Sequence, residues 1–318
     1  MDLQRKIYTT ELQGEKISLE VSHLAGKANA AVIGRHGDTA VLATVVMGKE
    51  DKQSDYFPLT VDYEERFYAA GKIIGSRFIR REGRPSDEAT LSARLIDRTI
   101  RPLFDNRLRR EVQIVVTILA YDGKNDPDMI ALLTASTALG ISDIPWGGPV
   151  AGLKVQSVND DKSIRYQGFF SGTKERINMI EFEGKEIQEN EVAEIFTRTH
   201  EEIKKLISFQ KSIIQEIGKP KADISLKNPD PELETFIRSI LKEKLAEAIK
   251  EKKLDELKNS ILESLAEHET LKTKLSEVDH IFETEVDAFV HNEALEHGKR
   301  PDGRKFDEVR ELYAETGL

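Results

Sequence analysis

The sequence predicts an α+β domain followed by a smaller domain built of helices. Up to about residue 182, short β-type runs alternate with turns and with two helical stretches, the pattern of a mixed α+β domain. Beyond residue 189 the chain changes to long stretches rich in Glu, Lys, Leu, Ile and Ala. Such stretches are typical of helices, and Gly and Pro at residues 218–220 and 228–231 mark breaks between them.

The strands of the first domain are marked by alternation or by apolar runs. Residues 16–21 alternate with a period of two, whereas residues 39–46 are largely apolar after the turn Gly37-Asp38, as expected for a buried strand. Further strands are expected at residues 111–120, 150–158, 166–170 and 177–182.

Two helices are expected between these strands. Ser86 is a typical N-cap, Asp87 and Glu88 complement the helix dipole in the first turn, and Pro102 ends a helix that runs to about Arg101. The second helix, at residues 129–141, is apolar and alanine-rich on all sides. It is therefore expected to lie buried between other elements.

The first of these helices has two different faces. The residues of its core side recur at helical spacing: Ala89, Ala93, Ile96 and Ile100. Another side carries three arginines: Arg94, Arg98 and Arg101. These arginines either pair with Asp97, Asp105 and carbonyl groups or contact a ligand, and the sequence supports both interpretations equally.

The helical domain is expected to span residues 190–297, after a first domain at residues 1–189. Its helices are expected at four stretches: 191–217, 230–253, 254–268 and 278–295. Residues 232–294 hold sixteen acidic and nine basic side chains, which fits a solvated helical surface. Residues 298–318 begin with a basic turn cluster, and we expect a third domain to start there and to be cut off.

The composition excludes several classes of function. The chain has no cysteine, which rules out disulfides, thiol catalysis and the common zinc sites built on cysteine. It has no apolar run long enough to span a bilayer, and its first residues lack the apolar stretch of a secretory signal. We therefore expect a soluble, cytoplasmic protein with no membrane partner.

Arginines gather in one part of this acidic chain. The formal net charge is -10, yet residues 76–110 hold ten arginines, no lysine and five carboxylates. A guanidinium matches phosphate oxygens two at a time and stacks on flat rings, so this gathering indicates a nucleic acid or nucleotide ligand. The pair Arg80-Arg81 beside Phe78, on a loop with Gly83, is typical of a contact to single-stranded nucleic acid.

Other motifs carry little chemistry. The chain has no Gly-x-x-x-x-Gly-Lys-Ser/Thr phosphate loop and no Gly-x-Gly-x-x-Gly after a strand. Glu181 and Glu183 would share one face of a strand, where two carboxylates could hold magnesium, but an exposed strand pair explains them equally well. Asp122, Asp126 and Asp128 are interpreted as turn formers.

Several motifs together resemble the bacterial polynucleotide phosphorylase family. They are Gly34-Arg35-His36-Gly37-Asp38-Thr39-Ala40-Val41-Leu42-Ala43-Thr44, Phe57-Pro58-Leu59-Thr60-Val61-Asp62-Tyr63, Arg80-Arg81-Glu82-Gly83-Arg84-Pro85-Ser86, Arg94-Leu95-Ile96-Asp97-Arg98 and the stretches 125–128, 141–145, 171–173 and 299–304. The resemblance covers essentially the whole chain. It implies a first RNase PH-like core with the ribosomal protein S5 domain 2-like fold, a helical linker domain, and the truncated start of a second core.

The resemblance also implies an activity. The family degrades RNA from the 3′ end by phosphorolysis, in which inorganic phosphate is the co-substrate and nucleoside diphosphates are released. Mg²⁺ assists, and both the metal and the catalytic residues belong to the second core, so no catalytic or metal-binding residue is expected in this chain. The implied partners are single-stranded RNA, two further copies in a homotrimer, and proteins of an RNA-degradation complex.

The resemblance implies that the family's channel-constricting Phe-Phe-Arg-Arg loop corresponds to Phe78, Ile79, Arg80 and Arg81 here, with the guanidinium of Arg77 alongside. The predicted RNA contacts are Arg77, Phe78, Arg80, Arg81 and Arg84. Ile79 departs from the family's second aromatic, and the stretch 159–170 is shorter than usual. We expect this portion of a polyribonucleotide nucleotidyltransferase to thread RNA and support the ring without catalysing. The alternatives are a stand-alone RNA-binding or ring-scaffold protein, and an enzyme with a site of its own near Glu181 and Glu183.

Overall fold

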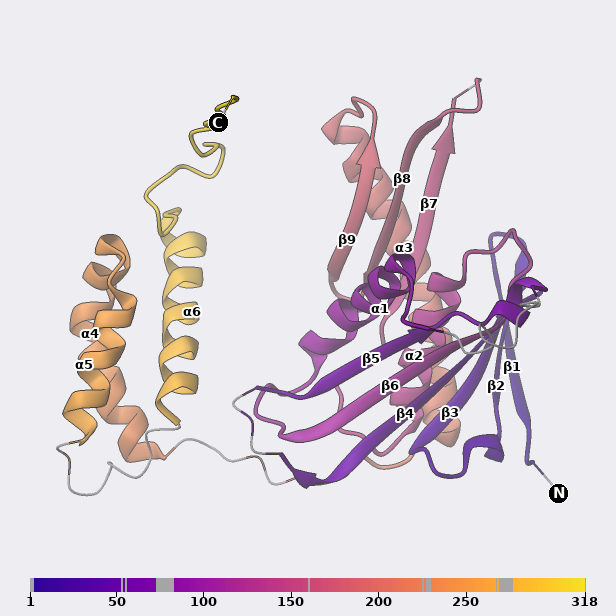
Figure 1. Cartoon of the computed structure of the whole chain (residues 1–318), viewed down its shortest axis with the longest axis horizontal. Helices are drawn as coiled ribbons and strands as arrows, with labels where there is room; N and C mark the ends of the chain where they lie inside the picture. The colour runs from indigo at the N-terminus through magenta and orange to yellow at the C-terminus, as the bar shows by residue number, and fades with distance from the viewer. Residues whose placement is uncertain are drawn as a thin grey trace. The chain divides into compact units, whose positions relative to one another are not determined.

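The structure is a computed structural model, and it falls into two compact units. It describes residues 3–52, 54, 56–72, 83–159, 161–224, 226, 230–266, 268 and 277–317. The first unit is Met1–Leu226 and the second is Lys227–Leu318 (Figure 1).

A six-stranded sheet forms the base of the first unit. Its strands are β1 (Lys6–Leu12), β2 (Glu15–Val21), β3 (Ala30–His36), β4 (Thr39–Asp51), β5 (Leu59–Glu64) and β6 (Arg110–Ala120). They lie in the order β1-β2-β3-β4-β6-β5, and all neighbours are antiparallel except the parallel pair β5 and β6. The strands expected at 16–21, 39–46 and 111–120 are confirmed.

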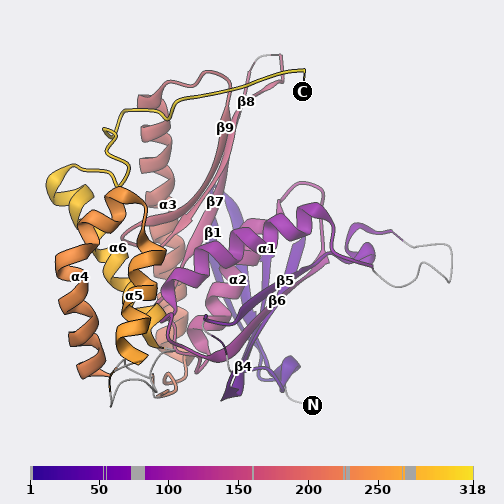
Figure 2. The same ribbon diagram turned by 60° about the vertical axis from the view of Figure 1, so that its left-hand side comes forward.

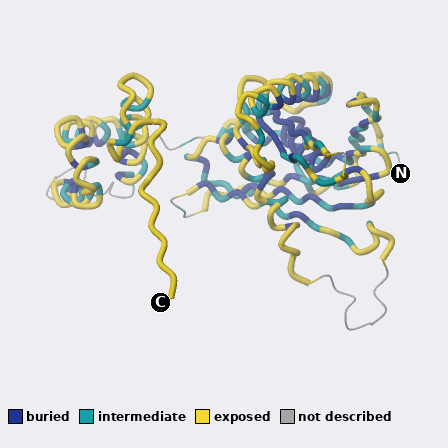
Figure 3. The backbone as a smooth tube through the Cα atoms, turned by 90° about the horizontal axis from the view of Figure 1, so that it is seen from above, coloured by how far each residue is buried: buried dark blue, intermediate teal, exposed yellow. Residues whose placement is uncertain are grey.

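One face of this sheet is covered by α2 (Pro127–Ile141). Every residue from Met129 to Ile141 is buried, because the sheet, α3 and β7 enclose the helix. Gly34 on β3 permits the close approach, since a Cβ there would lie 2.0 Å from Thr134 Oγ1. The buried segments accordingly run through the sheet and its covering helix (Figure 3). The prediction of a helix buried on all sides is confirmed.

A second, three-stranded antiparallel sheet completes the unit. Its strands are β7 (Ala151–Val158), β8 (Ile164–Gly172) and β9 (Ile177–Gly184), in that order. The helix α1 (Asp87–Ile100) packs on β5 and reaches β9, while α3 (Glu189–Ile217) packs on α2, β7 and β8. Short 3-10 turns lie at η1 (His23–Ala25), η2 (Phe67–Ala70) and η4 (Arg101–Leu103).

The helix α3 belongs to the first unit. The sequence places the domain boundary after residue 189, but the compact units divide after Leu226. The reason is packing: α3 buries Ile203, Leu206 and Ile207 in the core of the first unit. In addition, the buried Gln210 donates to Val150 O at 2.7 Å and accepts from Thr137 Oγ1 at 3.1 Å.

The segment that follows α3 is fastened to the end of α2. Lys221 Nζ donates to the carbonyl oxygens of Leu139, Gly140 and Ser142 at 2.8, 3.0 and 2.8 Å. Those are groups that a helix C-terminus leaves without intrahelical partners. Burial lowers the pKa of Lys221 to about 8. The backbone adds a contact, because Ala222 N donates to Asp143 O at 2.7 Å.

The described part of the second unit contains three helices: α4 (Pro231–Glu251), α5 (Leu254–Ala266) and α6 (Val278–His297). They bury a separate apolar core that includes Ile237, Leu241, Ile261 and Phe282. Asp230 caps α4 by accepting from the backbone of Glu232 at 2.9 Å. Residues 298–317 form neither helix nor strand. The small helical region expected from the sequence is therefore present in α4 to α6.

Candidate nucleic-acid interface

Of the five predicted RNA contacts, the structure describes Arg84 alone. Arg77, Phe78, Arg80 and Arg81 lie outside the described residues. Arg84 is described and exposed, two residues before the N-cap of α1. Figure 2 shows α1 beside β5, on which it packs, so Arg84 stands at the entrance to a helix of the first unit.

The start of α1 is built by Ser86. Its Oγ accepts from Ala89 N at 3.0 Å, which is the N-cap predicted from the sequence. The same hydroxyl donates to Glu65 Oε2 at 2.7 Å. Because Glu65 lies just before η2 and Ser86 just before α1, this hydrogen bond holds the two elements together at their ends.

The arginine at the C-cap of α1 is structural. Arg101 makes a two-pronged contact to Asp97, with Nε–Oδ2 at 2.9 Å and Nη2–Oδ1 at 2.6 Å. It also donates to the carbonyl oxygens of Phe57 and Leu59 at 3.3 and 3.1 Å. The pairing interpretation therefore holds for Arg101, which ties the end of α1 to the start of β5.

Two other arginines of α1 differ from it. Arg94 and Arg98 are exposed, and no hydrogen bond or ion pair joins either of them to another residue that the structure describes. Arg84 is in the same situation. Their charges are therefore not offset by a contact within the described part of the chain, as a phosphate-binding role requires. The core side of α1 is as predicted, with Ala89, Ile96 and Ile100 buried and Ala93 partly buried.

The remaining described arginines of the cluster have partners. Arg107 pairs with Asp105 at 2.6 Å, and Arg110 Nε lies 3.4 Å from Asp51. Arg109 donates to the carbonyl oxygen of Asn106 at 2.6 Å. The structure thus separates the predicted gathering into a paired set and an open set, of which the open set is Arg84, Arg94 and Arg98.

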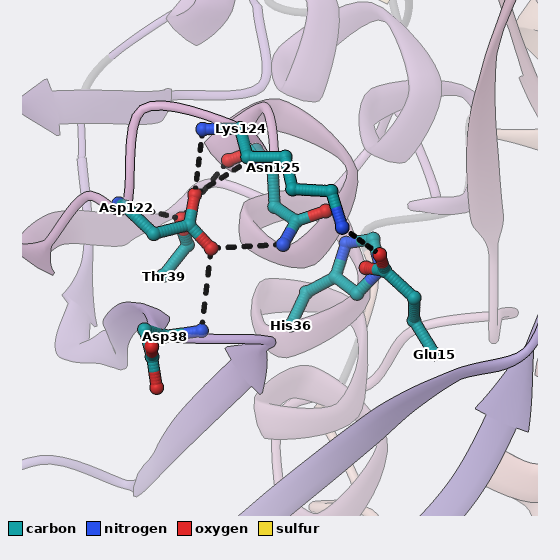
Figure 4. Close-up of polar contacts among 7 residues, drawn as sticks. All are labelled: Glu15, His36, Asp38, Thr39, Asp122, Lys124 and Asn125. Atoms are coloured by element: carbon teal, nitrogen blue, oxygen red, sulfur yellow. Dashed lines mark hydrogen bonds and ion pairs between the residues drawn. The ribbon is translucent and has the colours of Figure 1, made fainter.

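A polar cluster at the end of β3 includes Asp122 of the loop that follows β6 (Figure 4). Asp122 accepts from the backbone of Lys124 at 2.8 Å and of Asn125 at 2.7 Å, and these bonds hold the pKa of its carboxyl group well below the ordinary value. It therefore forms a turn, as predicted. His36 Nε2 lies 3.1 Å from Glu15 Oε2, but burial outweighs that carboxylate and lowers the pKa of the imidazole.

A second polar cluster was not predicted from the sequence. Tyr63 on β5 donates to Asp128 Oδ1 at 2.9 Å at the start of α2, and Ser92 of α1 also bonds that carboxyl group. Burial, together with the nearby charge of Asp126, raises the pKa of Asp128. Asp126 caps α2 and pairs with Lys154 of β7. These residues are spread along the chain, so no spacing could have revealed the cluster.

Comparison with known proteins identifies the family. Residues 13–145 match the family model described as 3′ exoribonuclease family, domain 1. The chain is 42% identical over 334 residues to a polyribonucleotide nucleotidyltransferase of Caldicellulosiruptor bescii, which covers 99% of this chain and 47% of that protein. It is 39% identical over 335 residues to the polyribonucleotide nucleotidyltransferase of Bacillus subtilis, and this match covers 100% of this chain and 47% of that protein. The chain belongs to the polyribonucleotide nucleotidyltransferase family. It spans about half the length of the curated relatives it matches and corresponds to their N-terminal part.

The family assignment confirms the resemblance and the RNase PH-like fold. Among solved structures, rice (Oryza sativa) Rrp46 matches with a TM-score of 0.48 and 12% identity, covering 67% of this chain and 96% of that one. None of the helices that the structure describes is both long and apolar enough to cross a membrane.

For a polyribonucleotide nucleotidyltransferase, the resemblance implies Mg²⁺, and the described residues do not fit a site for it. No group of three or more His, Asp or Glu side chains that could hold a metal occurs in the described ranges. Glu181 and Glu183 are exposed on β9, and Glu183 Oε1 accepts from Gln167 Nε2 at 2.6 Å. An exposed strand pair therefore describes these two glutamates, and no metal-dependent step is assigned to them.

Proposed function

We propose that this chain is the RNA-holding, non-catalytic portion of a polyribonucleotide nucleotidyltransferase. The whole enzyme would degrade single-stranded RNA from its 3′ end by phosphorolysis, with inorganic phosphate as co-substrate and nucleoside diphosphates as products. Mg²⁺ and the catalytic residues would belong to a second core outside this chain. The observation that carries the proposal is the open set Arg84, Arg94 and Arg98, on one helix and its entrance in a chain of net charge -10.

The electrostatic argument is local. A protein of net charge -10 repels a polyanion unless its cations are gathered. In the described part of the cluster, four arginines are used up by internal contacts, which leaves the open set to neutralise phosphates. Arg77, Phe78, Arg80 and Arg81 are proposed to extend this interface, with Phe78 stacking on a base.

The start of α2 supports the non-catalytic part of the proposal. The N-terminus of a helix is a natural phosphate site, because its free N–H groups and its dipole favour an anion. Here Asp126 accepts from Asp128 N at 3.0 Å, and the two carboxyl groups occupy that end of α2. A phosphate would meet two carboxyl groups of the chain itself, so the start of α2 is a poor place to bind the attacking phosphate.

Assembly and location are part of the same proposal. We expect the full-length protein to act as a cytoplasmic homotrimer and to meet other proteins of an RNA-degradation complex. Exposed apolar side chains such as Leu91 and Ile180, at 58% and 49% exposure, are suited to contacts between copies. A stand-alone RNA-binding or ring-scaffold protein is the alternative, and the same open arginines would serve it.

Three double variants, one of them a matched control, test the proposed interface. Binding of a labelled oligoadenylate is measured by fluorescence anisotropy over a series of salt concentrations. Each phosphate neutralised on a single strand contributes about 0.7 to the slope of log affinity against log salt. Arg94→Ala with Arg98→Ala should therefore flatten the slope by about 1.4, as should Arg80→Ala with Arg81→Ala. Arg107→Ala with Arg110→Ala removes the same charge from paired positions and should leave the slope nearly unchanged.

Two results would contradict the proposal. Equal slopes for all three double variants would show that net charge, and not the open set, controls binding. Phosphorolysis of oligoadenylate or polymerisation of ADP by the chain by itself, with Mg²⁺ and phosphate present, would show that this core has its own chemistry. In that case Glu181→Gln and Glu183→Gln would identify the carboxylates responsible, because an amide keeps the shape and loses the charge.

A further inference from the structure

Three large aromatic side chains are exposed where η2 meets the end of β6. Phe67 and Tyr68 of η2 are 45% and 59% exposed, and Tyr121, just after β6, is 44% exposed. Exposed aromatic rings that occur in one place, rather than singly, mark a contact surface. None of these three rings belongs to the interface proposed above.

The backbone holds these rings on a fixed support. Tyr121 N donates to Ala69 O at 2.9 Å, which joins η2 to the end of β6. Gly71 closes η2 with a φ of 67°, and its N–H donates to Tyr68 O at 3.0 Å. Lys72 N donates to Phe67 O at 3.0 Å. A tyrosine on such a support has few rotatable bonds left to fix, so it loses little entropy when a ligand stacks on it.

Cationic groups adjoin this aromatic surface. The Ser86–Glu65 hydrogen bond of 2.7 Å places the entrance of α1 beside the start of η2. Arg84 lies two residues before Ser86, and Tyr68 lies three residues after Glu65, so both are near this contact. Lys72 follows Gly71, the residue that closes η2.

We propose that Tyr68 and Tyr121 form a stacking platform for bases of single-stranded RNA, with Arg84 contacting an adjoining phosphate. This inference rests on the proposed function and adds to it a contact that does not depend on charge. The adjacent cations favour a nucleic acid over an apolar protein partner, since they match the phosphates that accompany the bases. Stacking is sequence-tolerant because every base has a flat face, which suits a protein that passes RNA of any sequence.

The test separates the ring from the rest of each side chain. Tyr68→Leu with Tyr121→Leu removes both rings, whereas Tyr68→Phe with Tyr121→Phe keeps them and removes the hydroxyl groups. The double leucine variant should bind labelled oligoadenylate about 5- to 150-fold more weakly for each base that loses its stacking contact. This corresponds to about 1–3 kcal/mol of stacking, since about 1.4 kcal/mol changes affinity tenfold. The phenylalanine pair should bind like the parent, and the salt slope should stay unchanged in both.

An abasic oligonucleotide of the same length supplies the second arm. It keeps the phosphates but offers no bases, so the parent should bind it more weakly and the leucine pair should lose nothing further. Circular dichroism and thermal unfolding of each variant exclude a folding defect, because these rings are exposed and the leucine pair should unfold at the parent's temperature.

The outcomes distinguish this inference from the function on which it rests. If the parent binds no RNA, the proposed function fails first. If the parent binds and the Arg94 and Arg98 variants weaken it while the leucine pair does not, the platform is wrong and the function stands. If the leucine pair changes the sedimentation of the chain but not its RNA affinity, the surface is a contact between protein copies, which also overturns the platform.

Discussion

The helices α1 and α2 of the first unit are almost equal in length, with 14 and 15 residues, yet they serve opposite purposes. The residues of α2 from 129 to 141 are all buried, and its polar groups bond within the core. By contrast, α1 buries one stripe and turns Arg94 and Arg98 outward. The fold therefore depends on α2, while α1 has one side free for a ligand.

The comparison also explains how one chain combines a firm core with a cationic surface. A buried helix must satisfy its own polar groups, as when Ser136 Oγ accepts from Val150 N at 3.0 Å. An outer helix is free of that demand on its exposed side. Substitutions in α2 should therefore affect stability, and substitutions on the exposed side of α1 should affect binding.

The largest effect is expected from the same substitution made in both helices. Leu133 of α2 is 0% exposed and Leu91 of α1 is 58% exposed. Leu133→Ala should lower the free energy of unfolding by about 2–5 kcal/mol, because it leaves a cavity in a packed core. Leu91→Ala should change it by less than about 0.5 kcal/mol. Urea unfolding measures both, and similar losses for the two variants would refute the division.

A smaller effect is expected within α1 itself. Arg101→Ala removes the contact to Asp97 and the hydrogen bonds to the carbonyl oxygens of Phe57 and Leu59, so it should cost about 1–2 kcal/mol of unfolding free energy. Arg98→Ala should cost less than about 0.5 kcal/mol, because no contact within the described residues is lost. Thermal and urea unfolding report the difference. A destabilised Arg98→Ala with an unaffected Arg101→Ala would reverse our assignment of structural and open arginines.

The smallest effect concerns the carboxyl group that joins the two helices. Burial raises the folded-state pKa of Asp128, so its ionisation opposes folding. The stability it contributes is complete below the unfolded pKa of about 3.9 and is lost as pH rises through the higher folded value. Asp128→Asn keeps an acceptor for Tyr63 and cannot ionise.

The Asp128→Asn variant should therefore gain stability over the parent as pH rises from about 4 to 7, by about 1.4 kcal/mol for each unit by which the pKa is raised. Urea unfolding at several pH values gives this difference. A difference that stays constant with pH would show that the carboxyl group does not titrate in the way its burial implies.

Much of the fold follows from local sequence signals. The cap at Ser86, the stop at Pro102 and the apolar run of α2 are features of neighbouring residues, and each appears in the structure where the sequence puts it. The attachment of α3 could not be read in this way. Its composition matches the helices of the second unit, and only the tertiary contacts of Ile203 and Gln210 decide which core it joins.

The candidate site was predictable in kind but not in detail. The gathering of arginines is a property of the sequence, whereas the separation into paired and open members depends on geometry. One part of it follows a local rule: an acid four residues before a base pairs well on a helix, which favours Asp97–Arg101. The exposed tyrosines escaped the sequence argument, because their proximity is created by the backbone contact between η2 and β6.

The capture of α2 by Lys221 has a mechanical consequence. The chain leaves α3 at residue 217 and enters the second unit after residue 226, so any tension applied to the second unit passes along this connection. The ammonium group of Lys221 is held by three carbonyl oxygens before that tension can reach α3. We therefore expect a force on the helical unit to act first on the C-terminal end of α2, through Lys221. The packing of α3 on the core would then stay undisturbed.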